Sequence, residues 1–113
     1  MENKKLEALL SYLLGWITGI IFLLIEKDSY VRFHAVQSIY TFGGLDILII
    51  ILSILASIAL ALGGWGISLI LHWIINLIWL LHFVLWIVLM IKAYQGERFK
   101  LPIVGDIAEK YAA

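Results

Sequence analysis

Long apolar segments separated by short polar ones dominate the chain. Residues 8–25 carry no charged side chain, and residues 47–91 carry none either. A helix needs roughly 17–25 apolar residues to cross a bilayer, so residues 8–25 predict one spanning helix. The longer segment is interrupted by three glycines in residues 63–66, which favour a tight turn. We therefore predict two more spans, at about 39–62 and 67–91.

The tail after the third span contains residues that typically end helices, form turns and begin helices. Gly96 is suited to end the third helix, and Pro102 with Gly105 favours a turn. Asp106, followed three residues later by a glutamate, resembles a capping box at the start of a helix. We expect a short helix over 106–112 at the membrane interface.

Composition explains why these helices need a membrane. Hydrophobic residues make up 64% of the 113 residues and charged residues 14%, against roughly 25% charged in a soluble domain. A chain this short has too little interior to bury so many apolar side chains in water. We therefore predict an all-α fold, an integral membrane bundle of three transmembrane helices with a short interfacial C-terminal helix, in a single domain over 1–113.

The placement of lysine and arginine predicts an orientation. The N-terminal flank holds two of these residues and the 63–66 turn none, whereas the 26–38 loop and the tail after residue 91 hold six together. Cytoplasmic loops carry the excess of Lys and Arg. With three spans, the loop and the tail would face the cytoplasm and the N-terminus would lie outside.

Charge and motif content exclude several kinds of function. The formal net charge is zero, which argues against a nucleic-acid partner. The chain has no cysteine, so disulfides, thiolate metal sites and thiol nucleophiles are excluded. His72 and His82 are ten residues apart and turn about 80° away from each other on a helix, which argues against a metal site. We expect no catalytic residue, no enzyme activity, no metal and no cofactor.

Each predicted span carries a stripe of small or polar residues at helical spacing. In lipid, small residues let helices approach closely, and polar side chains hydrogen-bond across the helix interface. We favour helix packing over a transport pathway for the serines, Asn76 and the glycines of these stripes, whereas His72 and His82 could be core hydrogen-bonders or proton carriers. The residues are Gly15 and Gly19 in the first span, Gly43, Ser53 and Ser57 in the second, and His72, Asn76 and His82 in the third.

Asp46 is the one charged residue that does not flank a span. An ionised carboxylate at the bilayer centre costs about 3 kcal/mol or more, so it should be near an interface, paired or protonated. One interpretation is an interfacial carboxylate that reaches water. The other is a polar contact inside the bundle, or a site for a cation or a proton.

Two short motifs carry a resemblance to a known family. The segments 10–19 and 31–38, the latter with Phe33, His34, Gln37 and Ser38, precede a tail with Gly96, Pro102 and Gly105. This combination resembles a family of small prokaryotic membrane proteins related to the channel-associated component of the chloroplast inner-envelope protein-import translocon (the TIC translocon).

The resemblance implies a helical integral membrane protein, and a translocation role only for the plastid branch. The plastid relatives are drawn with four spans, whereas this chain predicts three. No catalytic residue is carried over. His34 and Gln37 share one helix face, where they would hold the loop by hydrogen bonds, contact a partner, or simply begin an interfacial helix.

Three hypotheses for function follow. The leading one is a small non-enzymatic membrane protein that works by helix assembly, as a homo-oligomer or with other membrane subunits. The alternative is a subunit of an oligomeric channel or protein-translocation complex, because three helices cannot enclose a wide pore alone. A third is contact with membrane lipids through the basic loop and tail.

Overall fold

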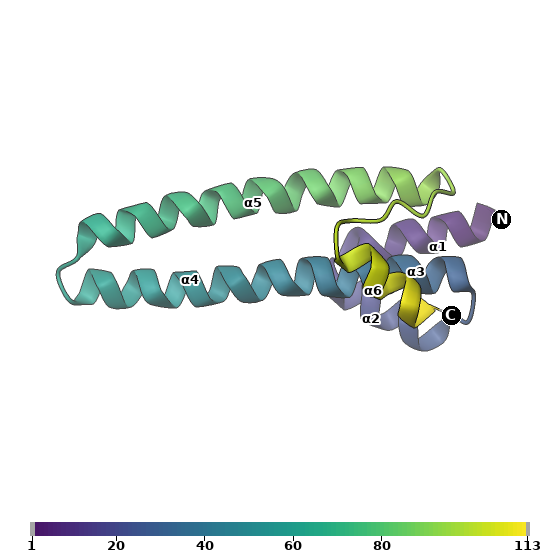
Figure 1. The fold of residues 1–113 in the computed structure, drawn as a ribbon, viewed down its shortest axis with the longest axis horizontal. Coiled ribbons are helices and arrows are strands. Elements are labelled where there is room, and N and C mark those ends of the chain that lie inside the picture. The colour runs from purple at the N-terminus through teal and green to yellow at the C-terminus, as the bar shows by residue number, and fades with distance from the viewer. Residues whose placement is uncertain (1, 113) are drawn as a thin grey trace.

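The computed structural model describes residues 2–112, and helices account for most of them. A long antiparallel helical hairpin projects from one end, where the shorter helices and both chain ends gather (Figure 1). The molecule is 55 Å long and 22 by 21 Å across. The helices are α1 (Glu2–Leu13), α2 (Trp16–Ile25), α3 (Ser29–Ser38), a π-helical turn (Ile39–Gly43), α4 (Gly44–Ala61), α5 (Trp65–Tyr94) and α6 (Val104–Ala112).

Two helices are long and apolar enough to cross a membrane. The first is continuous from Ser29 to Ala61 through the π-helical turn, and the second is Trp65–Tyr94. They correspond to the predicted second and third spans, apart from Leu62, which lies just beyond the first helix. The turn between them is shorter than predicted, because α5 already begins at Trp65, and Gly63 adopts the φ of +83° that a non-glycine residue disfavours.

The predicted single helix over 8–25 is not formed. It is divided into α1 and α2 at Gly15, where φ is +64° and ψ is −133°. The Thr18 hydroxyl accepts a hydrogen bond from the Leu14 backbone N–H at 3.2 Å, which stabilises the break. At 12 and 10 residues, α1 and α2 are each about half the length needed to cross the hydrocarbon core.

The chain reverses direction at this break, so α1 and α2 form a short hairpin. Its two ends are joined by Lys4 and Glu26, whose Nζ and Oε2 atoms are 2.9 Å apart. The prediction of three transmembrane helices is therefore not confirmed. The orientation with the N-terminus outside depends on that third span, and it stays a prediction.

The tail folds back onto α3. Helix α6 begins at Val104, two residues earlier than predicted, and its Ala108 and Ala112 pack against Phe33 and Val36. A Cβ atom at Gly105 would overlap the side chain and backbone of Lys100, so the first turn of α6 requires a glycine. The predicted C-terminal helix is confirmed as a helix, and its interfacial position stays a prediction.

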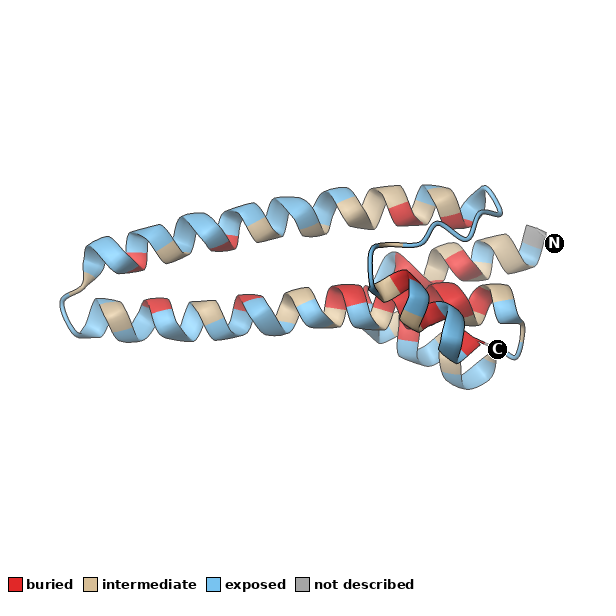
Figure 2. Cartoon of the chain, viewed as in Figure 1, coloured by how far each residue is buried: buried red, intermediate tan, exposed pale blue. Residues whose placement is uncertain are grey.

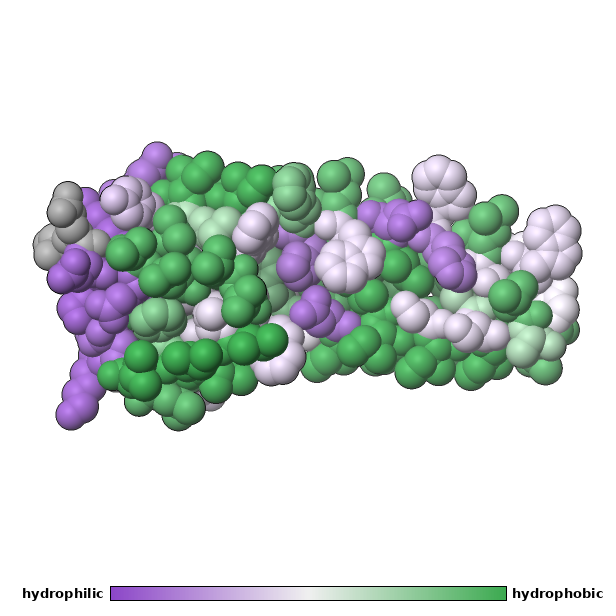
Figure 3. All heavy atoms as spheres, turned by 180° about the vertical axis from the view of Figure 1, so that it is seen from behind, coloured by the Kyte–Doolittle hydropathy of each residue, from purple (hydrophilic) through white to green (hydrophobic). Residues whose placement is uncertain are grey.

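Burial divides the molecule into two parts. Buried residues concentrate where α1, α2, α3 and α6 meet, whereas the long hairpin is mostly exposed (Figure 2). The exposed hairpin is apolar, and hydrophilic residues gather at the opposite end (Figure 3). Exposed large hydrophobic side chains on such a scale suit contact with lipid, which supports membrane localisation. We call the buried part the compact end.

Candidate functional site

A buried polar network joins α1, α3 and the tail at the compact end. The Tyr12 hydroxyl is 2.6 Å from His34 Nδ1, and Gln37 Nε2 donates to the same hydroxyl at 3.0 Å. All three side chains are fully buried. The spacing of His34 and Gln37 predicts their shared face, and Tyr12 is the additional residue that meets it.

The same two motif residues bind the backbone of the tail. His34 Nε2 lies 3.0 Å from the Glu97 carbonyl oxygen. Gln37 donates to the Phe99 carbonyl at 2.8 Å and accepts from the Leu101 N–H at 3.0 Å. Because a buried backbone group without a partner costs free energy, these bonds hold the irregular tail in place. The geometry fits the interpretation in which the motif holds the chain by hydrogen bonds.

Ser38 and two of the predicted packing glycines contact the helices of the α1–α2 hairpin. Ser38 donates to the Gly15 carbonyl at 2.8 Å and so supports the break between α1 and α2. Gly19 lies against α3, where a Cβ atom would come within 2.9 Å of the Ala35 carbonyl oxygen. Gly43 faces Trp16 with ordinary van der Waals spacing. These glycines therefore lie at contacts between elements of the compact end.

Tail residues have local roles in the same assembly. Gly96 ends α5 with a φ of +83° and lies close to the Lys5 side chain, whereas Pro102 is exposed. Lys100 forms ion pairs with Asp106 and Glu109, and the hydrogen bonds that it donates to Glu109 and Asp106 raise the pKa of its ammonium group. The Arg98 guanidinium lies over the Phe33 ring, 5.6 Å from its centroid. Both basic side chains thus have partners within the chain.

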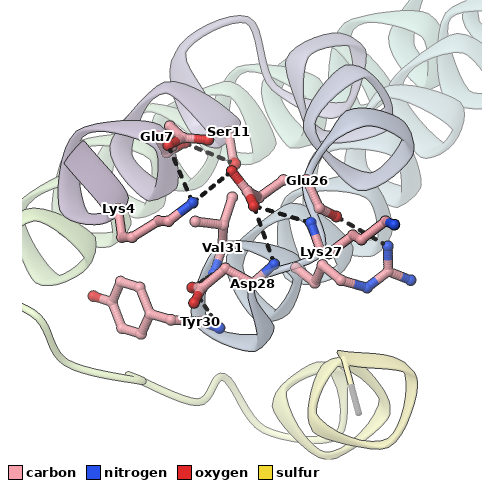
Figure 4. Close-up of polar contacts among 9 residues, drawn as sticks. Lys4, Glu7, Ser11, Glu26, Lys27, Asp28, Tyr30 and Val31 are labelled. Atoms are coloured by element: carbon pink, nitrogen blue, oxygen red, sulfur yellow. Dashed lines mark hydrogen bonds and ion pairs between the residues drawn. The ribbon is translucent and has the colours of Figure 1, made fainter. Parts of the chain in front are cut away.

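A charged cluster closes the α1–α2 hairpin (Figure 4). Lys4 lies between the carboxylates of Glu7 and Glu26, at 3.7 Å and 2.9 Å. The hydrogen bond that Glu26 shares with the Glu7 side chain, and then the one it accepts from Lys4, lower the pKa of Glu26 to about 2, and the shared bond raises the pKa of Glu7. The backbone N–H groups of Lys27 and Asp28 also donate to Glu26. The cluster holds both ends of the hairpin together.

A second polar site surrounds Asp46, where the tip of the α1–α2 hairpin meets α4 and α5. Trp16 Nε1 donates to Asp46 Oδ2 at 3.0 Å, and His82 Nε2 lies 3.3 Å from Oδ1. The structure thus brings Asp46 and His82 together, which helical spacing within one span cannot predict. Trp16 is a member of this site that the sequence analysis missed, although it lies in the family segment 10–19.

Trp86 is the other missed residue. Its indole N–H donates to the Tyr12 and Leu13 carbonyls at 2.9 Å and 3.1 Å. These carbonyls lie at the C-terminal end of α1, where the helix stops, and the Tyr12 carbonyl also accepts from the Gly15 backbone N–H at 2.9 Å. No local sequence signal identifies this role, since it depends on the reversal of the chain.

The other intramembrane polar residues lie on the outside of the long hairpin. Ser53, Ser57, His72 and Asn76 are all exposed. His72 Nδ1 lies 2.8 Å from the Ser68 carbonyl oxygen, which can only accept, so Nδ1 carries the proton. In neutral His72, Nε2 is therefore an exposed acceptor. We call these four residues the polar face.

Residues 2–112 contain no group of three or more His, Cys, Asp or Glu side chains that could hold a metal ion. Asp46 and His82 are a pair only, and structural metal sites use about four ligands. Both polar sites provide hydrogen bonds. The network of Tyr12, His34 and Gln37 is buried and structural, whereas the site around Asp46 lies beside a cavity and the lipid.

Comparison with known proteins gives the family. The model of the magnetosome magnetite crystal formation protein family matches residues 4–108. A UPF0132 membrane protein of Methanocaldococcus jannaschii is 50% identical over 111 residues, 97% of this chain and 89% of the relative. A UPF0132 membrane protein of Archaeoglobus fulgidus is 49% identical over 109 residues, 96% of this chain and 94% of the relative. No solved structure gives a significant match.

These matches confirm the prediction of a small prokaryotic membrane-protein family, while the relation to the chloroplast translocon stays a prediction. The family match and the exposed apolar hairpin agree on a membrane location. The chain belongs to the magnetosome magnetite crystal formation protein family (MamF/MmsF).

Proposed function

We propose that this protein is a non-enzymatic membrane component that acts by assembling with further copies of itself inside the bilayer. The observation that carries the proposal is the polar face, which places hydrogen-bonding side chains on a surface that otherwise suits lipid. Placing polar groups in the membrane costs free energy, and such groups usually face other helices. A second copy of the chain would supply the helix that the polar face lacks.

The four residues lie on one side of the hairpin. Ala56 and Ile75 are buried between α4 and α5 and mark the inward direction of each helix. Ser57 and Asn76 follow them by one residue and are therefore turned about 100° from that direction. Because the helices are antiparallel, both rotations lead to the same side. Figure 3 shows hydrophilic side chains interrupting one hydrophobic face at mid-length and again further towards the end of the hairpin.

The depths of these residues suit a symmetric pair. Ser53 lies nine residues before Leu62, and His72 lies eight residues after Gly64, so the two are at similar distances from the hairpin turn. A twofold axis along the membrane normal keeps the depths of both copies equal. A Ser53 hydroxyl would then face the Nε2 acceptor of His72 in the second copy.

Replacing the polar face by apolar residues tests the proposal. Interhelical hydrogen bonds in membranes contribute about 0.6–2 kcal/mol each, so the double variant His72→Leu/Asn76→Leu should weaken self-association about tenfold or more. Energy transfer between labelled copies in lipid vesicles measures the affinity. The matched control is Ile74→Ala, a change to an exposed side chain on another side of α5. Equal affinity in the double variant and the control would contradict the proposal.

The channel or translocation subunit is the alternative, and it rests on the family resemblance together with Asp46. Two candidate spans per chain enclose no aqueous path, so conduction would require several copies. Planar-bilayer recordings of the pure protein test it. A conductance that changes in Asp46→Asn would favour this alternative, and the absence of conductance would leave assembly alone.

A further inference from the structure

A cavity lies beside Asp46, closer to the compact end than the polar face is. Its volume is about 310 Å³, at the lower limit of small-molecule sites. Its wall is formed by the tip of the α1–α2 hairpin and by one side of α5. The lining residues are Leu13, Leu14, Gly15, Asp46, Trp79, His82, Phe83 and Trp86.

The site lies well inside the apolar part of the molecule. Asp46 is 14 residues beyond Arg32, and His82 is ten residues before Lys92, which are the nearest charged residues along each helix. At 1.5 Å per residue these separations are about 21 Å and 15 Å. Trp79 and Phe83 line the cavity and are also exposed on the apolar surface, so a guest would enter from the lipid.

The Asp46 carboxylate is oriented but not neutralised by a permanent cation. Its two oxygens are held by the Trp16 indole N–H and by His82 Nε2, both of which are uncharged donors when His82 is neutral. Among the ion pairs of residues 2–112, His82 is the only basic partner of Asp46. A negative charge in a medium of low dielectric strongly favours a bound cation.

Aromatic side chains line the cavity beside this carboxylate. Trp79, Phe83 and Trp86 line the cavity, and the Trp79 and His82 rings are 5.3 Å apart. Aromatic faces attract cations, and desolvated sites of this kind recognise quaternary ammonium groups. A second apolar recess of about 510 Å³ shares Asp46 with this cavity, is also lined by Trp16, and offers space for alkyl substituents.

We propose that the cavity between Asp46 and the aromatic residues of α5 binds a hydrophobic organic cation from the lipid phase. The carboxylate supplies the charge, the aromatic rings supply cation–π contacts, and Leu13 with Leu14 contacts the apolar substituents. A metal ion fits this site poorly, because the only other metal-ligating side chain that lines it is His82. The guest class is a tetraalkylammonium-like ion.

Equilibrium binding of radiolabelled tetrapropylammonium to the protein in zwitterionic lipid nanodiscs tests the proposal. We expect saturable binding above that of empty nanodiscs. Asp46→Asn should weaken it about tenfold or more, because the attraction of a partly buried carboxylate is lost. Trp79→Leu should weaken it about two- to fivefold through the lost cation–π contact.

The control is Trp73→Leu, which removes an equally large exposed tryptophan of α5 that does not line the cavity. It should bind like the wild type. If Asp46→Asn unfolds, the difference in affinity between Trp79→Leu and Trp73→Leu tests the proposal without it. The proposal is overturned if the wild type binds no more than empty nanodiscs, or if folded Asp46→Asn binds like the wild type. It is also overturned if both tryptophan variants bind alike. Equal competition by the uncharged hydrocarbon 4,4-dipropylheptane would overturn it as well.

Discussion

Gln37 shows how one side chain holds distant parts of this chain together. It donates to Tyr12 and to the Phe99 carbonyl, and it accepts from the Leu101 N–H, while being fully buried. The sequence motif predicts that Gln37 and His34 share a face. It cannot predict their partners, because Tyr12 lies in another helix and the others are backbone groups of an irregular tail about 60 residues further along the chain.

We expect Gln37→Leu to lower the free energy of unfolding by about 3 kcal/mol, since two partly buried backbone groups of the tail and the buried Tyr12 hydroxyl each lose a hydrogen bond. Denaturant unfolding in mixed micelles measures the change, and faster proteolysis between residues 97 and 103 reports release of the tail. Gln95→Leu makes the same chemical change at an exposed position and should have little effect. Equal destabilisation by the two variants would show that the network does not hold the tail.

At the scale of elements, local patterns predict α4, α5 and α6 well and the first segment poorly. The apolar segment 8–25 is long enough to span the membrane, yet the helix is interrupted at Gly15. The break is stabilised by Thr18 nearby, and by Ser38 and Trp86 from elements that follow much later. Of these three residues, only Thr18 lies close enough in the sequence to be considered with the segment. Periodicity therefore favours one helix where two are formed.

The packing of α2 on α3 depends on Gly19. A methyl group there would meet the Ala35 carbonyl oxygen at 2.9 Å and Ile39 at 3.0 Å, so the two helices must separate. We expect Gly19→Ala to destabilise the protein by about 1–3 kcal/mol. Gly44→Ala is the matched control, because nothing lies within 4 Å of its Cβ position and alanine favours the helix. Thermal unfolding followed by circular dichroism should separate the two variants, and a Gly19→Ala midpoint at or above that of Gly44→Ala would contradict the close contact.

The whole molecule has a polar end, where its charged residues other than Asp46 gather, and an apolar hairpin ending in an uncharged turn (Figure 3). The ion pair of Lys4 and Glu26 places the ends of the first segment side by side. If only α3–α4 and α5 cross the membrane, both termini lie on one side, and the excess of Lys and Arg places that side in the cytoplasm.

Cysteine labelling tests this topology cleanly, because the chain has no cysteine of its own. We expect Asn3→Cys and Glu109→Cys to react with a membrane-impermeant maleimide from the same side of the membrane. Leu62→Cys, at the hairpin turn, should react from the other side. Labelling of Asn3→Cys and Glu109→Cys from opposite sides would instead support the three spans expected from hydropathy.

Self-assembly through the polar face is the central claim for the whole molecule, and site-directed crosslinking in native membranes tests it most directly. Ser53→Cys lies on the polar face, and Leu55→Cys is exposed at nearly the same depth on another side of α4. With a short bis-maleimide, we predict that Ser53→Cys gives a species at twice the 12.8 kDa mass of the chain and that Leu55→Cys gives far less. A Ser53→Cys chain that stays monomeric, or equal crosslinking of the two variants, would contradict the account.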